Sequence, residues 1–324
     1  MEWIAEIKFH YENIFVRSQR YAFGDIYGIS FLKEYRIPKT YHFDIATKPA
    51  GEKKIALYVI CDSYIADNLQ PNYFTNVDTV YYADWRDENQ TFELDTTKTN
   101  ILIIESVERY FMYRFYDKDK LKYGFSNLAA ETKSTAENVY TKITSGLFNS
   151  EINDNLEFVL FDNKAFTFFK HLRTTFNQRC FDRIPSCVTI SDDKKYLFLS
   201  ETTDSTQDES SFYNFTTDDV QKRVANVDTM AQHYKQSGFD KVYLSVIPNP
   251  VTIIGYKNLK YNNLLPMIDS TKAENFENID VYREFKASHK QIFCYADTHW
   301  NANGLQIWIN KVDEVLKIKK RMCK

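Results

Sequence analysis

Continuous apolar runs recur along the chain and are separated by longer polar or amphipathic stretches. The clearest run, Ile55 to Cys61, is apolar at every position, which is typical of a strand buried on both faces of a parallel sheet. Similar runs follow at Val77 to Ala83, Ile101 to Ile104 and Val242 to Ile247, and a last short one lies at Gln291 to Tyr295. Because the intervening segments suit helices and turns, we expect an α/β fold with these strands in one parallel sheet flanked by helices.

Helical patterns are clearest toward the end of the chain. Thr217 and Asp218 can cap a helix that runs toward Gly238, and apolar residues at helical spacing after Gly304 predict a closing helix. The chain also opens with a helical pattern, which is compatible with a helix packed on the domain or with a stalk leading to a membrane. Its apolar residues are Trp3, Ile7, Tyr11 and Ile14.

The segment from residue 111 to residue 217 has a different pattern, in which helical stretches and polar turns dominate. We expect residues 1–324 to form a single domain in which 111–217 is a largely helical insertion or cap. A separate domain is the alternative.

Composition narrows the range of partners. Lys and Arg number 41 against 44 Asp and Glu, a net charge of −3, so no basic excess favours nucleic-acid binding. The longest apolar run, Ile55 to Cys61, falls well short of the roughly 20 residues of a membrane span. The five cysteines form no CxxC pair and no HExxH occurs, so we expect no metal or other cofactor. Cys180 and Cys187 could pair in an oxidising compartment, whereas Cys61 is expected to be a small buried hydrophobe.

Two short polar segments follow predicted strands. Asp62 and Ser63 come directly after the run that ends at Cys61, and Asp297 and His299 follow the last short run. Open α/β sheets place their sites at the carboxyl ends of parallel strands. Serine hydrolysis needs an imidazole near the hydroxyl and a carboxylate that fixes the imidazole tautomer. We therefore expect Ser63, His299 and Asp297 to converge as a catalytic triad.

These segments resemble motifs of the SGNH hydrolase superfamily. The stretch VICDSY is similar to its GDS block, and DTHWN followed by Gly304 resembles the D-x-H-W signature of the alginate O-acetyltransferase branch. The stretches IIESVER (103–109) and VIPNP (246–250) resemble two further segments of that branch. The resemblance covers residues 55–109 and 238–308. The Ser block comes first here, so the resemblance implies a permuted relative of that branch with an SGNH-like, flavodoxin-like sheet.

The chain departs from the superfamily pattern in the groups that stabilise an oxyanion. Cys61 replaces the first Gly, no Gly occurs around Tyr82, and the strand that should offer an Asn leads to Arg109. We expect Arg109 to supply the missing oxyanion donor. Tyr82, Asn249 and Trp300 are further candidates for contacts with the oxyanion or the substrate, although Trp300 could equally pack beside the histidine.

The resemblance implies ester chemistry at carbohydrate hydroxyls. It predicts a serine esterase or O-acetyltransferase that acts on acetylated polysaccharide of the cell envelope or exopolysaccharide, with a membrane-bound acetyl donor as a further partner. It also implies an extracytoplasmic, periplasmic or membrane-anchored location, although a cytoplasmic protein is not excluded. The alternative is a non-catalytic module of the same fold that binds polysaccharide or an envelope assembly partner.

Overall fold

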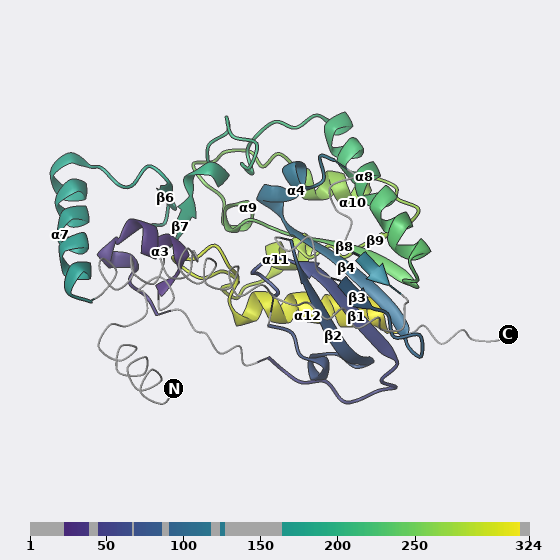
Figure 1. Ribbon diagram of the computed structural model, residues 1–324. Coiled ribbons are helices and arrows are strands. Elements are labelled where there is room, and N and C mark those ends of the chain that lie inside the picture. Colours follow the sequence, from purple (N-terminus) through teal and green to yellow (C-terminus); the bar gives the residue numbers. More distant parts are fainter. Residues whose placement is uncertain are drawn as a thin grey trace, which may run out of the picture. The chain divides into compact units, whose positions relative to one another are not determined.

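The computed structural model describes residues 23–38, 45–66, 68–85, 91–117, 124–126 and 164–317 (Figure 1). Their contacts divide the chain into two compact units. The described part of the first unit comprises residues 23–38, 164–199 and 295–298, and the remaining described residues form the second unit. The amphipathic segment expected at residues 3–14 lies outside the described residues.

The second unit contains a five-stranded parallel sheet, which confirms the expected α/β fold. Its strand order is β2-β1-β4-β8-β9. The strands are β1 (Ile55–Cys61), β2 (Val77–Asp84), β4 (Thr99–Val107), β8 (Lys241–Ile247) and β9 (Glu277–Asn278). The four long apolar runs named above therefore share one sheet. The short pair β3 (Thr91–Glu93) and β5 (Gly124–Ser126) forms a separate parallel ladder.

The central strands owe their position to their apolar sequence. Every residue of β1 is buried, as are all residues of β4 after Thr99, because strands on both sides and helices on both faces cover them. Ile60 of β1 pairs with Ile104 of β4, which pairs in turn with Leu244 of β8. The carboxyl ends of these three strands therefore lie at the same edge of the sheet.

Helices cover both faces of this sheet (Figure 1). Side chains of β1, β4 and β8 form one core cluster with α8 and α10. On the opposite face, the Trp308 indole of α12 donates to the hydroxyl of Ser245 in β8. The helices of this unit are α4 (Glu108–Arg114), α8 (Thr217–Gln236), α9 (Pro250–Ile254), α10 (Leu264–Ser270), α11 (Tyr282–Ala287) and α12 (Ala302–Leu316), with the 3-10 turns Pro71–Tyr73 and Ser200–Thr202.

Two local predictions need correction. The N-cap of α8 is Thr216, whose hydroxyl accepts the amide of Asp219, so Thr217 and Asp218 lie inside the helix. The run from Gln291 to Tyr295 is not a strand of the sheet. Its backbone pairs with the residues just after it, through a bridge between Phe293 and Trp300, and β9 occupies the sheet edge instead.

The first unit is built from short elements. A small antiparallel pair, β6 (Val188–Ile190) and β7 (Leu197–Leu199), packs against α3 (Asp25–Ser30). The unit also contains the 3-10 turn Lys33–Tyr35 and the long helix α7 (Lys164–Phe181). Cys180 and Cys187 are exposed free thiols, and Cys61 in the second unit is buried as expected. No helix in the described part of the chain is long and apolar enough to cross a membrane. A single domain with an insertion at 111–217 stays a prediction.

Candidate active site

Ser63 and His299 meet in the second unit although 236 positions separate them. The exposed Ser63 lies in the turn that follows β1, and His299 lies just before the Asn301 cap of α12. The Ser63 Oγ atom is 2.8 Å from His299 Nε2, which is hydrogen-bond distance. This is the geometry in which an imidazole can take the proton of an attacking hydroxyl.

The backbone of the Ser63 turn leaves one amide without an acceptor. The Asp62 amide donates to Glu105 Oε2 (2.9 Å), and the Tyr64 amide donates to Asp62 Oδ1 (3.0 Å). The amides of Ile65 and Ala66 both donate to the Asp62 carbonyl. Among the described residues, no acceptor lies within hydrogen-bond range of the Ser63 amide. This amide is therefore available to an oxyanion that forms beside Ser63.

The buried carboxyl group of Glu105 accepts a hydrogen bond from the backbone of the Ser63 turn. Glu105, near the end of β4, is fully buried, and burial raises its pKa well above the usual range. The neighbouring charge of Asp62 raises the pKa of Glu105 further, while the cationic Arg114 lowers it. Arg114 lies 3.6 Å from Asp62 Oδ2 and stacks on the Trp85 ring, whose Nε1 donates to the Glu105 carbonyl. The turn is thus held by one side chain from β4 and one from α4, and Trp85, the residue after β2, contacts both of these residues.

Arg109, in the first turn of α4, has hydrogen-bond donors that no described residue accepts. The Nε and Nη1 atoms of its guanidinium are buried and have no hydrogen-bond partner among the described residues. The guanidinium carbon lies 5.9 Å from the centre of the Tyr64 ring, which is 4.6 Å from the centre of the His299 ring. Buried donors without partners are costly, so their presence beside Tyr64, whose ring contacts His299, is consistent with a ligand that completes them.

The three remaining predicted contacts have other partners. The Tyr82 hydroxyl donates to the Leu69 carbonyl and accepts the Leu69 amide, so it anchors the segment after the nucleophile. Trp300 is 1% exposed and packs against Tyr64 and Trp308, so its packing alternative is the one observed and no face is open to a sugar ring.

Asn249 is also fully buried, at the carboxyl end of β8. Its backbone amide donates to Glu108 Oε2, and its side-chain Nδ2 donates to the hydroxyl of Ser211. Glu108 further accepts the hydroxyls of Thr252 and Tyr261. Burial raises the pKa of Glu108. Glu105 and Glu108 therefore bind different partners and do not form a paired-carboxylate site.

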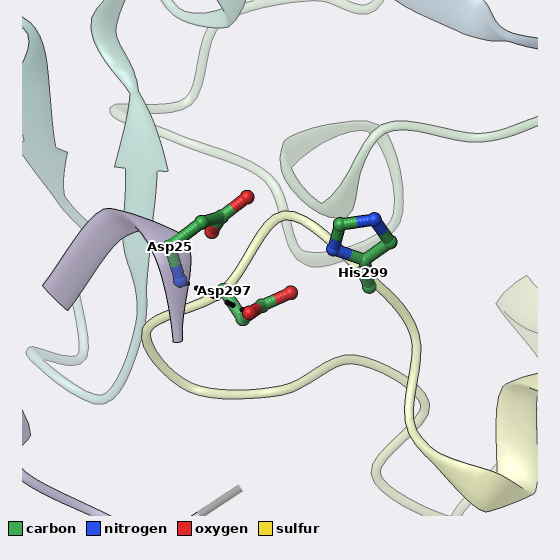
Figure 2. Close-up of side chains that lie close together, drawn as sticks. All are labelled: Asp25, Asp297 and His299. Carbon is green, nitrogen blue, oxygen red and sulfur yellow. Dashed lines mark hydrogen bonds between the residues drawn. The ribbon is translucent and has the colours of Figure 1, made fainter. Parts of the chain in front are cut away.

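Asp297 belongs to the first unit, whose boundary falls between Thr298 and His299. Its Oδ2 atom accepts the backbone amide of Asp25 at 3.0 Å (Figure 2). In return, the amide and hydroxyl of Thr298 donate to the Asp25 carboxylate, at 2.8 and 2.6 Å. The start of α3 thus holds the D-x-H segment at two successive residues. The part of Asp297 in a triad stays a prediction that rests on its two-residue spacing from His299.

Gly24 makes this close approach possible. Its φ of 114° and ψ of 158° lie in a region that only glycine adopts readily, and an added Cβ would lie 2.2 Å from the Ala296 carbonyl oxygen. Gly255 has nearly the same backbone angles but open space around it, so it provides a matched control.

We expect Gly24→Ala to lower the free energy of unfolding by about 2 kcal/mol more than Gly255→Ala. Both substitutions place a Cβ on a backbone with positive φ, but only the Cβ at position 24 would also clash with the Ala296 backbone. Urea denaturation of both variants measures the difference. Equal losses would show that the contact with Ala296 does not constrain the loop.

No family model, curated protein or solved structure matches this chain.

Sequence reasoning missed the support around the nucleophile. Glu105 accepts the Asp62 amide, and the cation whose charge lowers its pKa is Arg114. Tyr64, which joins Arg109 to His299, gave no signal beyond its position after Ser63. Nothing in the sequence around Asp25 indicated that it would contact Asp297 and Thr298, which are more than 270 positions away.

Proposed function

We propose that the chain is a serine esterase or O-acetyltransferase that acts on acetylated carbohydrate. The observation that carries this proposal is the 2.8 Å separation of Ser63 Oγ and His299 Nε2 at the carboxyl edge of a parallel sheet. The free Ser63 amide and the unpaired nitrogens of Arg109 support it, because ester chemistry needs donors for a developing oxyanion.

The proposed reaction has two halves. Ser63 Oγ attacks the ester carbonyl carbon while His299 Nε2 takes its proton, and the Ser63 amide and Arg109 stabilise the oxyanion. The intermediate collapses, the C–O bond to the leaving alcohol breaks, and His299 returns the proton to that alcohol. Water or a sugar hydroxyl then attacks the acyl carbon while His299 takes its proton. The C–O bond to Ser63 Oγ breaks, and His299 returns the proton to Ser63 Oγ. Asp297 is assigned the role of orienting the imidazole.

The choice of substrate and location comes from the motif resemblance. The D-x-H-W and CDS segments resemble enzymes that acetylate polysaccharide, so we propose an acetylated envelope polysaccharide or exopolysaccharide as substrate, a membrane-bound protein as acetyl donor and an extracytoplasmic location.

The direct test combines labelling with turnover. A fluorophosphonate probe should label wild-type protein at Ser63, as located by peptide mass spectrometry, and 4-nitrophenyl acetate should be hydrolysed. Acetylated oligosaccharides, with and without an unacetylated acceptor, then separate esterase from transferase. A protein that binds saccharide but shows neither labelling nor turnover would favour the non-catalytic module.

Glu105 should make stability depend on pH. Its pKa is raised in the folded protein, so the folded state binds this proton more tightly than the unfolded chain. The free energy of unfolding should therefore fall as pH rises from the ordinary Glu pKa through the raised one, by about 1.4 kcal/mol per unit of difference. Glu105→Gln mimics the protonated form, and urea titrations across pH should show that it lacks this decline. Glu314→Gln is the control, because it removes an exposed carboxyl of α12 and should leave the decline in place. A decline of unchanged size in Glu105→Gln would contradict the assignment.

A further inference from the structure

Helix α7 of the first unit packs through its polar side. His171 Nε2 pairs with the Tyr27 hydroxyl, the Thr174 hydroxyl donates to the Ser30 carbonyl, and the Lys170 ammonium lies 4.5 Å from the centre of the Phe31 ring. None of the side chains from residue 168 to residue 181 is buried. The helix therefore contributes little to a core.

The apolar side of α7 faces solvent instead. Four large side chains are between 57% and 63% exposed, and their spacing of one, three and four residues places them on one helix face. They are Phe168, Phe169, Leu172 and Phe176. A helix on a globular protein normally turns such a stripe toward the core, so this orientation is reversed. Exposed apolar clusters of this kind indicate an interaction site.

The charges of α7 have one sign. The helix contains Lys164, Lys170, Arg173 and Arg179, and no Asp or Glu. A cavity of about 500 Å³ beside it is lined by Lys170, Arg173 and Arg183, together with the polar Ser30, Thr174 and Asn177.

The neighbouring 3-10 turn and its C-cap add two cations, Lys33 and Arg36, and one carboxylate, Glu34. Burial lowers the pKa of His171, the charges of Arg36 and Lys33 lower it further, and the charge of Glu34 raises it. An anionic surface would complement these cations, whereas it would repel a helix that carried acidic residues.

We propose that α7 docks the first unit on an anionic lipid surface. The exposed Phe and Leu stripe enters the boundary between headgroups and acyl chains. Arg173 is exposed, lines the cavity and lies next to the stripe, four residues after Phe169, and it binds a lipid phosphate. Aromatic and Leu residues on one side, with Lys and Arg around them, are the features of helices that lie in the membrane interface. This inference does not depend on the ester chemistry, because it uses none of the residues assigned to that site.

The test is flotation of the full chain with vesicles of phosphatidylcholine alone or with about 30% phosphatidylglycerol, a composition that gives a strongly anionic surface. Wild type should float with the anionic vesicles and only weakly with neutral ones. The triple variant Phe168→Ser/Leu172→Ser/Phe176→Ser should lose at least about tenfold in partitioning. Lys170→Gln/Arg173→Gln/Arg183→Gln should lose the preference for anionic lipid. Tyr113→Ser, at a similarly exposed aromatic residue of the second unit, should bind as wild type does.

A second readout reports insertion without altering the stripe. Cys180 is an exposed free thiol near the end of α7, and a polarity-sensitive dye attached there, with the other accessible cysteines replaced by serine, should shift to the blue on anionic vesicles. Equal binding to both vesicle types, unchanged flotation of the apolar variant or an unshifted dye would overturn the proposal. So would a dimer in light scattering that the apolar variant abolishes, because the stripe would then bind a second copy.

Discussion

Replacing Ser63 with alanine should lower acetyl-ester turnover by about 10⁴-fold or more, because the variant lacks the only proposed nucleophile. The fold should be unaffected, since Ser63 is exposed and its hydroxyl bonds only to His299 among the described residues. His299→Ala should lose a comparable amount. The double variant should lose little more than either single one, because the two groups act as a unit. Steady-state hydrolysis of 4-nitrophenyl acetate measures all three.

The matched control for this experiment is Ser205→Ala, which removes an exposed hydroxyl from a polar turn of the same unit. It should retain full turnover, and thermal melting should be the same for all variants. Unchanged hydrolysis in Ser63→Ala would refute the esterase proposal. The double variant provides a second check. If its loss of turnover equals the combined losses of the two single variants, the two residues do not act in the same step.

Replacing Arg109 with methionine should separate activity from stability. Turnover should fall by about 10²- to 10³-fold, the usual cost of losing one donor to an oxyanion. The free energy of unfolding should fall by no more than about 1 kcal/mol, because Nε and Nη1 are buried without partners among the described residues and methionine keeps most of the packing. The loss is limited to the cation–π contacts with Tyr64 and Tyr110. Parallel kinetics and urea denaturation provide the two numbers.

The control for this loss is Arg283→Ala, which removes an arginine whose side chain is 80% exposed. It should change neither quantity. A large loss of stability in Arg109→Met would show that the guanidinium has a structural role. Normal turnover in that variant would leave the Ser63 and His299 proposal in place but would remove Arg109 from the oxyanion site.

The sheet was predictable wherever burial alone determines a strand. The runs at β1, β4 and β8 are apolar and buried enough to identify them without any knowledge of their neighbours. β2 is less buried, and its segment was recognised from its Val, Tyr and Ala residues. β9 was missed because two residues at a sheet edge carry no pattern. The run at Gln291 to Tyr295 was misassigned because an apolar segment can pair with its own continuation, here through Phe293 and Trp300, as readily as with a sheet.

Only the Ser63 half of the candidate site follows the end of a sheet strand. His299 was expected beside Ser63 because a strand was assigned to Gln291 to Tyr295, yet the sheet contains no such strand, and the loop before α12 brings the imidazole to Ser63 instead. The Asp25 contacts with the D-x-H segment could not be predicted, since they join residues more than 270 positions apart through a turn that only Gly24 permits. Glu105 can support the Ser63 turn only if its side chain points toward that turn. It lies near the end of β4, where the regular alternation of side chains between the two faces of the sheet stops, so the sequence does not predict its direction.

The separation of 236 positions between Ser63 and His299 also has a consequence for synthesis. The hydroxyl leaves the ribosome long before the imidazole exists, and β8, the inner strand that pairs with β4, is made in between. A nascent or C-terminally truncated chain therefore carries an ordinary, unreactive serine. In the proposed mechanism Ser63 becomes reactive only when α12 has packed on the sheet and brought His299 to it, so labelling of Ser63 is expected to count the molecules that have completed folding.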